Sequence, residues 1–383
     1  METNTHPGQD THTAPNTHTA PHAHTPPHAH TPPHAHTPPH AHTPPHAHTP
    51  PHAHPDPYTR SLGRSGIRVS ALGFGCWAIG GEWQAADGQP LGWGKVDDEE
   101  SVRAVHRALD LGVTFFDTAD AYGTGHSERV LGRALGKRRA DVVVATKWGN
   151  VFDTATRTLT GQDDTPAHAR RALTASLDRL GTDHVDLYQF HLSDADPERA
   201  ALLRDACEEF VREGLIRAYA WSTDDPDRAA VFAEGPHCAA VQHRLNILQD
   251  APGLLALAEE YDLASINRSP LAMGLLTGKH TPGRALDAGD IRSTPPAWLE
   301  GFTAGGGGDP EWLGRVEALR EILTTGGRTL AQGALAWIWA RSPRTVPIPG
   351  FRSVAQAEEN AGALAKGPLT ADQVAEIDRI LGR

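Results

Sequence analysis

The sequence predicts an α/β protein, a closed (β/α)8 barrel of the TIM type over residues 58–383 with an N-terminal β-hairpin, preceded by a tail over residues 1–57. Apolar, β-branched runs alternate with helix-periodic segments, and the pattern gives eight strand-then-helix units. Three successive runs end in a polar residue, at the position where barrel strands present functional groups. An open doubly wound sheet is the alternative. It is disfavoured because no G-x-G-x-x-G follows an early strand.

The tail differs sharply in composition from the rest of the chain. A six-residue repeat, P-H-A-H-T-P, runs from Pro21 to about Pro50, and 15 of the 23 histidines lie before Tyr58. Without large aliphatic residues the tail cannot bury enough apolar surface to offset the entropy of ordering, so we expect it to be disordered. Its histidines predict weak chelation of zinc, nickel or copper ions. An expanded repeat with no ligand is the competing interpretation.

The first predicted elements are a hairpin, a strand and a helix. Residues 59–63 and 67–70 flank a tight Arg-Ser-Gly turn and predict a β-hairpin that covers the N-terminal mouth of the barrel. Residues 71–74 are the first barrel-strand candidate. Asp97 or the residue after it can cap the next helix, because a carboxylate there accepts hydrogen bonds from free backbone N–H groups.

Each of the next three units ends its strand in a polar side chain. The strand candidates and their end residues are 113–116 with Asp117, 141–146 with Lys147, and 184–190 with His191. The helices that follow are predicted over residues 127–135, from Pro166 onward, and over residues 198–212. Pro166 suits the first turn of a helix, where a missing N–H costs nothing. Residues 148–164 predict a loop.

The second half of the chain continues the alternation. Its strand candidates are residues 216–221, 239–241, 263–266 and 345–348; its helix candidates begin at Pro226 and cover 254–260, 312–323, 330–340, 354–364 and a last segment from Thr370. The Gly/Pro-rich segment over residues 280–310 predicts an insertion. We interpret it either as a lid over the substrate pocket or as a disordered excursion.

Composition argues against several classes of function. A formal net charge of −12 gives no support to nucleic-acid binding, which needs a basic face. No stretch has the apolar length of a membrane span, and we see no signal peptide. The three cysteines lack the spacing of a disulfide framework or a zinc site. We therefore expect a cytoplasmic protein whose barrel holds no metal.

Four polar side chains at the predicted C-terminal end of the barrel form a candidate catalytic group. Tyr122 follows Asp117 closely, and Lys147 and His191 end the next two strands. The phenol has a reference pKa of about 10, which a neighbouring Lys147 ammonium would lower. Asp117 would keep the lysine charged and oriented, and His191 would hydrogen-bond a substrate oxygen. Such a phenol suits general acid catalysis on a carbonyl, and a nicotinamide would have to supply the hydride.

Each of these four residues also has an ordinary structural explanation. Buried Asp–Lys pairs and core tyrosines are common, and a single histidine is more often a satisfied core residue than a catalyst. The four together at successive strand ends favour an active site.

Several motifs make the chain similar to the aldo-keto reductase superfamily. They are F-D-T-A-D-A-Y-G, A-T-K, D-L-Y-Q-F-H, S-P-L-A-M-G-L-L-T-G-K and the E-N after P-G-F-R-S, and the match covers nearly all of residues 58–383. The resemblance implies a barrel that binds NADPH in extended form without a Rossmann motif. It also implies that Tyr122 is the proton donor and that Lys147, Asp117 and His191 complete a catalytic tetrad.

The resemblance further implies a set of cofactor-binding positions. The nicotinamide end corresponds to Gly75, Trp77, Ser222, Thr223, Gln242 and Arg268. The pyrophosphate loop corresponds to Ser269, Leu271 and Gly274, and the adenosine end to Gly350, Arg352, Gln356, Glu359 and Asn360.

The chain departs from the family pattern at four of these positions. Thr223 stands where Asn is usual, and Arg268 stands where an aromatic residue often stacks on the nicotinamide. An arginine can also lie flat on a π-face. Gly350 and Gln356 stand where many members have Lys and Arg. Arg352 remains to bind a 2′-phosphate, so the resemblance implies NADPH, with NADH as the second candidate.

Tryptophans in loops are candidates for the substrate pocket. They are Trp83 and Trp148, together with Trp93 and Trp298, although loop tryptophans serve packing as often as binding. The sequence thus predicts reversible NADPH-dependent reduction of an aldehyde or ketone, with a small carbonyl compound as partner. A nicotinamide-binding regulatory or scaffold protein with little turnover is the alternative.

Overall fold

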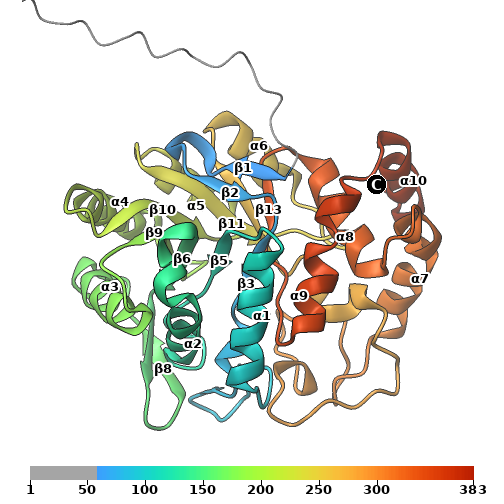
Figure 1. Cartoon of the computed structure of the whole chain (residues 1–383), viewed down its shortest axis with the longest axis horizontal. Helices are drawn as coiled ribbons and strands as arrows, with labels where there is room; N and C mark the ends of the chain where they lie inside the picture. Colours follow the sequence, from blue (N-terminus) through green and yellow to red (C-terminus); the bar gives the residue numbers. More distant parts are fainter. Residues whose placement is uncertain (1–57) are drawn as a thin grey trace, which may run out of the picture. The chain divides into compact units, whose positions relative to one another are not determined.

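An eight-stranded parallel sheet forms a barrel within residues 58–383, which are the residues that the computed structural model describes (Figure 1). In hydrogen-bonded order the strands are β3 (Gly73–Gly75), β5 (Phe115–Asp117), β6 (Val143–Trp148), β9 (Val185–Phe190), β10 (Ile216–Ser222), β11 (Cys238–Arg244), β12 (Ala264–Arg268) and β13 (Thr345–Pro347). The edges meet at a bridge between Gly75 and Gly350, where the Gly75 N–H donates to the Pro349 carbonyl at 3.1 Å. The predicted fold class is confirmed.

Helices pack around the outside of the barrel. They are α1 (Asp98–Asp110), α2 (His126–Leu135), α3 (Pro166–Leu180), α4 (Pro197–Arg212), α5 (Pro226–Ala233), α6 (Pro252–Glu260), α7 (Pro310–Thr324), α8 (Leu330–Arg341), α9 (Val354–Ala361) and α10 (Ala371–Leu381). Their capping follows the sequence. The Asp97 side chain accepts hydrogen bonds from the backbone N–H groups of Glu99 and Glu100, and Pro166 occupies the first turn of α3.

Side chains on each barrel strand alternate between the interior and the helix-covered exterior, as successive strand residues must. On β6, Val143 and Ala145 belong to the interior cluster, whereas Val144 and Trp148 pack outward with the helices. This alternation decides which polar residues at a strand end can reach the inside of the barrel.

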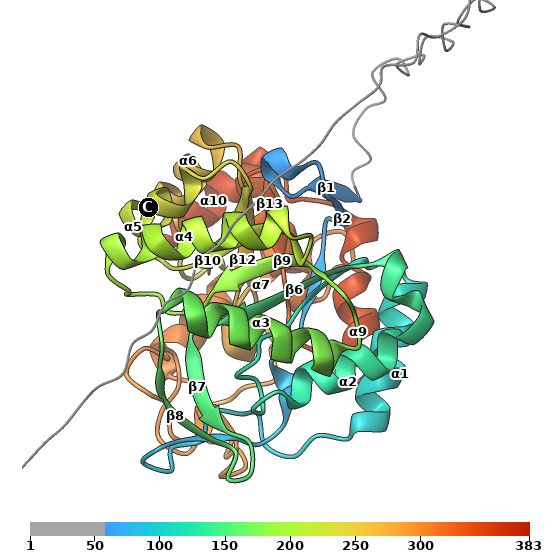
Figure 2. The ribbon, with the colours of Figure 1, turned by 90° about the vertical axis from the view of Figure 1, so that its left-hand side faces the viewer.

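The predicted hairpin consists of β1 (Thr59–Ser61) and β2 (Arg68–Ser70), which pair in antiparallel register. Its apolar residues Leu62, Ile67 and Val69 belong to the same buried cluster as the barrel interior, so the hairpin covers the N-terminal mouth. Figures 1 and 2 place it at the end of the barrel opposite β8 (Thr158–Gln162).

The end of the barrel where β8 lies carries a second, smaller sheet. β4 (Gln84–Ala85), β8 (Thr158–Gln162) and β7 (Asn150–Asp153) pair in that order, and β7 and β8 form a projecting hairpin (Figure 2). The prediction of a loop over residues 148–164 was wrong. No residue of β8 is buried, and Thr158, Thr160 and Gln162 are polar, so the segment lacks the apolar alternation by which a half-buried strand is recognised.

The insertion over residues 280–310 follows a defined path at the same end. The Ile291 N–H donates to the Gly92 carbonyl at 2.8 Å, which ties the insertion to the loop after β4. The Arg292 guanidinium lies 4.4 Å from the centre of the Trp93 ring and strengthens that tie through a cation–π contact.

Among the described residues, no helix has the length and apolar character needed to cross a membrane. The predictions of disorder and of metal binding for the tail concern residues 1–57, which lie outside the described part of the chain.

Candidate active site

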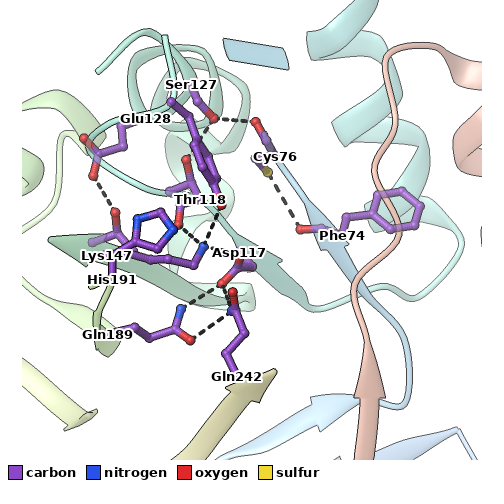
Figure 3. Close-up of polar contacts among 12 residues, drawn as sticks. Phe74, Cys76, Asp117, Thr118, Ser127, Glu128, Lys147, Gln189, His191 and Gln242 are labelled. Carbon is purple, nitrogen blue, oxygen red and sulfur yellow. Dashed lines mark hydrogen bonds and ion pairs between the residues drawn. The ribbon is translucent and has the colours of Figure 1, made fainter. Parts of the chain in front are cut away.

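A cleft of about 820 Å³ opens at the C-terminal end of the barrel strands. Asp117, Tyr122 and His191 line it, and Lys147 lies behind them with a side chain that is 0% exposed. They come from the end of β5, the loop after it, the position directly after β9 and the strand β6 between them. Figure 3 shows Asp117, Lys147 and His191 close together. The structure therefore brings together the four residues that the sequence placed at strand ends.

The Lys147 ammonium is held by three oxygen atoms. Its Nζ lies 2.5 Å from Asp117 Oδ2, 2.7 Å from the Thr118 carbonyl oxygen and 3.3 Å from the Tyr122 hydroxyl. The first two contacts fix the ammonium, and the third directs its remaining donor at the phenol. A charged donor at this distance stabilises negative charge that develops on the phenol oxygen.

The Asp117 carboxylate is held by donors from three other strands. Its Oδ2 accepts from Lys147, and its Oδ1 accepts from Gln189 Nε2 at 2.7 Å and from Gln242 Nε2 at 2.8 Å. Gln242 also donates to Gln189 Oε1 at 2.9 Å (Figure 3). Gln189 was missed by sequence reasoning. The available signal was the period of two on β9, which puts Leu187, Gln189 and His191 on one face.

A second buried polar network packs behind these residues. The Ser127 hydroxyl lies 2.8 Å from the Thr118 hydroxyl, and Glu128 accepts from Thr146 at 2.6 Å and from Arg179 at 2.6 Å. Thr118 and Thr146 adjoin Asp117 and Lys147 in sequence, so α2 fixes the backbone that carries the charged pair (Figure 3).

The charges of the site follow from burial and from this pairing. Burial lowers the pKa of Lys147, but attraction to Asp117 and Tyr122 outweighs it, so the pKa lies above its usual value and the amine stays charged. Burial raises the pKa of Tyr122 above 10, and the Lys147 charge offsets only part of that rise. The expectation of a lowered pKa for Tyr122 was wrong, because desolvation of the phenolate exceeds the attraction of one ammonium.

His191 is a neutral imidazole at physiological pH. Burial, and then repulsion from Lys147 and Arg268, lowers its pKa well below 6.5. The ring meets Tyr122 edge to face with centroids 5.8 Å apart, and Asn150 Nδ2 lies 3.4 Å from Nδ1. An amide donor at Nδ1 favours the tautomer that carries its proton on Nε2, which leaves an N–H for a substrate oxygen.

Aromatic side chains form one wall of the cleft. The Trp77 ring stacks on the Tyr122 ring with centroids 5.8 Å apart, and Trp83, Trp93 and Trp298 also line the cleft. Trp148 does not, so the prediction that it contacts substrate was wrong. It is the last residue of β6, its side chain is 0% exposed, and it stacks on Phe190 outside the barrel. One step beyond the inward-facing Lys147 turns a strand side chain to the opposite face.

Most of the cofactor positions implied by the resemblance share this cleft. Those that line it are Gly75, Trp77, Ser222, Gln242, Arg268, Ser269, Leu271, Gly274, Gly350, Arg352 and Gln356. Thr223, Glu359 and Asn360 do not line it: Thr223 donates to the Ser193 carbonyl, Glu359 pairs with Lys279 at 3.7 Å, and Asn360 donates to the Gly350 carbonyl.

The residues present fit an extended dinucleotide. The cleft runs from the phenol of Tyr122 to the guanidinium of Arg352, so a redox end and a cationic end lie in one continuous space. Between them, Ser269, Met273 and Gly274 have positive φ angles of 52°, 53° and 103°. Met273 and Gly274 are consecutive left-handed residues, and the tight turn that they form lies at the wall of the cleft.

A sequence model of the aldo/keto reductase family matches residues 71–381. Chloroplastic pyridoxal reductase of Arabidopsis thaliana is 32% identical over 334 residues, which cover 82% of this chain and 83% of that protein. An Oryza sativa subsp. japonica protein named probable voltage-gated potassium channel subunit beta is 30% identical over 342 residues, covering 84% and 94%. The structure of an aldo-keto reductase from Klebsiella pneumoniae in complex with NADPH is similar, with a TM-score of 0.59 and 26% identity, covering 84% and 95%.

These matches span the whole barrel and agree with the resemblance that the motifs carry. The predicted enzyme class, a nicotinamide-dependent oxidoreductase, is the class of the matching family. The chain belongs to the aldo/keto reductase family.

Proposed function

We propose that this protein reduces an aldehyde or ketone reversibly to an alcohol with NADPH, with Tyr122 as the general acid. The observation that carries the proposal is the contact between the charged Lys147 and the Tyr122 hydroxyl at 3.3 Å, beside a neutral His191 at the wall of the cleft. Its three cysteines are free and buried, which supports the cytoplasm as its compartment.

Each side chain of the site has a separate role in the proton transfer. A substrate carbonyl oxygen between Tyr122 and His191 accepts hydrogen bonds from both, which polarises the carbonyl carbon. As negative charge develops on that oxygen, the phenol proton moves to it, and Lys147 stabilises the phenolate that remains. Asp117, fixed by Gln189 and Gln242, holds Lys147 charged and in place. A bound nicotinamide supplies the hydride that this chemistry requires.

NADPH is proposed over NADH because of Arg352. Its side chain lines the cleft and donates to the Trp93 carbonyl at 2.8 Å, which holds the guanidinium at the cleft wall. A guanidinium there suits a 2′-phosphate, which NADH lacks. The solved relative from Klebsiella pneumoniae is a complex with NADPH, in line with this assignment.

Consumption of NADPH, followed by its absorbance with a panel of small aldehydes and with NADH in parallel, tests the proposal. Turnover that is faster with NADPH supports it. If the chain binds NADPH but reduces nothing in the panel, the alternative of a regulatory or scaffold protein is favoured instead. The relative named as a channel subunit gives that alternative its motivation.

The pH profile of the reaction follows from the two pKa directions. We expect kcat/KM for aldehyde reduction to change little between about pH 6 and pH 9. His191 stays neutral there because its pKa is far below 6.5, and the Tyr122 proton is lost only as the pH rises through a value above 10. Steady-state rates in buffers of constant ionic strength measure this. A tenfold break near pH 6.5 would contradict the assignment of a neutral imidazole.

We propose that residues 1–57 form a segment separate from the barrel and bind transition metal ions weakly through the repeat histidines. Among the described residues, no group of three or more His, Cys, Asp or Glu side chains could hold a metal ion. If the repeat histidines bind metal ions, calorimetric titration with Ni²⁺ should show binding to the full chain. A full-length variant with the repeat histidines changed to glutamine should show almost none, and equal binding by both proteins would refute the proposal.

A further inference from the structure

The cleft contains more positive charge than its own carboxylates neutralise. Six basic side chains line it, and three of them form ion pairs: Arg268 with Asp224, Arg292 with Asp290, and Lys279 with Glu359. The other three, Arg244, Arg284 and Arg352, have no carboxylate partner at ion-pair distance anywhere in residues 58–383. The chain has a formal charge of −12, so carboxylates are in excess, and yet none of those in the described part of the chain pairs with these three arginines. We infer that a negatively charged ligand binds there.

Two of the three unpaired arginines lie at the end of the cleft given to the cofactor phosphates. Arg352 donates to the Trp93 carbonyl, and Arg284 donates to the Lys279 carbonyl at 2.5 Å; both side chains line the cleft together with Gly274. A dinucleotide with several phosphates accounts for both. Arg244 is left without such an explanation.

Arg244 stands on the barrel wall near the reaction centre. It is the last residue of β11, and it shares the inward face of that strand with Ala240 and Gln242. Its partner in register on β12 is Arg268, which also faces inward. The two guanidinium groups thus lie on adjacent strands, and only one carboxylate, Asp224, is available between them.

Both carboxylate oxygens of Asp224 already accept hydrogen bonds from other groups. Its Oδ2 accepts from Arg268 at 2.5 Å, and its Oδ1 accepts from the backbone N–H of Arg244 at 2.7 Å. The Arg244 guanidinium itself makes only one long contact, from Nη2 to the Trp298 carbonyl at 3.4 Å. Glu300 lines a small side pocket next to it but is bonded by Gln249 at 3.1 Å. Most of the five guanidinium donors of Arg244 are therefore available to a ligand.

The surroundings of Arg244 define the rest of that ligand. Trp298, whose side chain is 47% exposed, borders the same part of the cleft, and Trp77 and Trp83 line the wall near Tyr122. We propose that Arg244 binds a carboxylate of the substrate, so that the substrates are aldehydes or ketones with an apolar body and a negatively charged end. The assignment rests on the proposed carbonyl reduction and names its substrate class. A guanidinium suits a carboxylate because the two groups form paired, charge-assisted hydrogen bonds.

Two near-isosteric aldehydes test the assignment by kinetics. The ratio of kcat/KM for 4-formylbenzoate to that for 4-formylbenzamide is compared between the wild type and Arg244→Gln, because this comparison cancels the intrinsic reactivity of each aldehyde. We expect the ratio to fall about tenfold in Arg244→Gln and to recover in part in Arg244→Lys. It should also fall with added salt in the wild type. Arg212→Gln, which removes an exposed charge on α4, should leave the ratio unchanged.

An unchanged ratio in Arg244→Gln overturns the assignment while leaving carbonyl reduction intact. A weaker affinity for NADPH in the variant with no loss of selectivity also overturns it, because Arg244 would then serve the cofactor phosphates. Binding of benzoate and benzamide, followed by tryptophan fluorescence, decides the case without turnover. Tighter binding of benzoate that is lost in Arg244→Gln supports the assignment. Equal binding of both by the wild type refutes it, even if the protein reduces no aldehyde.

Discussion

Replacement of Tyr122 with phenylalanine is expected to lower kcat for aldehyde reduction by about 10²–10⁴-fold, the usual contribution of a general acid. The substitution removes a single oxygen. The ring keeps its stack on Trp77, and the Lys147 ammonium keeps the two oxygen atoms that lie closest to it, those of Asp117 and Thr118. The loss should therefore fall on the chemical step, with the affinity for NADPH within about twofold of the wild type.

Steady-state rates and a fluorescence titration of NADPH measure the two quantities separately. Tyr261→Phe is the matched control, because it removes a hydroxyl at the end of α6 and should leave both quantities unchanged. Equal turnover by Tyr122→Phe and the wild type would show that another group donates the proton.

Replacement of Lys147 with methionine is expected to abolish measurable reduction and to lower the free energy of unfolding by about 3 kcal/mol. The side chains of Lys147 and Asp117 are 0% and 3% exposed, so the carboxylate would remain buried without its counterion. Its hydrogen bonds from Gln189 and Gln242 remain, which keeps the cost at the lower end of the range for broken buried pairs.

Urea unfolding followed by tryptophan fluorescence measures the change in stability. The double variant Asp117→Asn/Lys147→Met removes both charges, so it should be more stable than Lys147→Met alone while remaining inactive. If Lys147→Met unfolds at the wild-type urea concentration, the pair makes no net contribution to the stability of the barrel.

The sequence alone was sufficient to predict the barrel fold and to predict that the four polar residues lie close together. Both rest on local patterns: strand runs, helix caps such as Asp97, and the rule that parallel strands present their ends on one side. The β7–β8 hairpin was missed because its two strands pair with each other without burying any residue, so the sequence shows no sustained alternation of apolar and polar residues there.

The errors at the site have a different cause. Trp148 was misplaced because the strand extends one residue past Lys147, and a shift of one residue exchanges the inner and outer faces. The pKa of Tyr122 was misjudged because desolvation depends on how many atoms surround the phenol, which only the packed structure gives. Gln189 was missed because it lies between Tyr188 and Phe190 in a run that predicts a buried strand.

The hydrogen bonds around Asp117 also bear on how the protein acquires activity as it folds. Its partners lie on β6, β9 and β11, and the Gln242 contact joins residues 125 positions apart in the chain. Contacts of such long sequence separation form late, since loop-closure entropy has to be overcome first. A chain that has made its helices and its first strands can pair Asp117 with Lys147, but it still lacks the hydrogen bonds from Gln189 and Gln242 that fix the other carboxylate oxygen. Recovery of turnover during refolding reports closure of the barrel rather than the earlier gain of secondary structure.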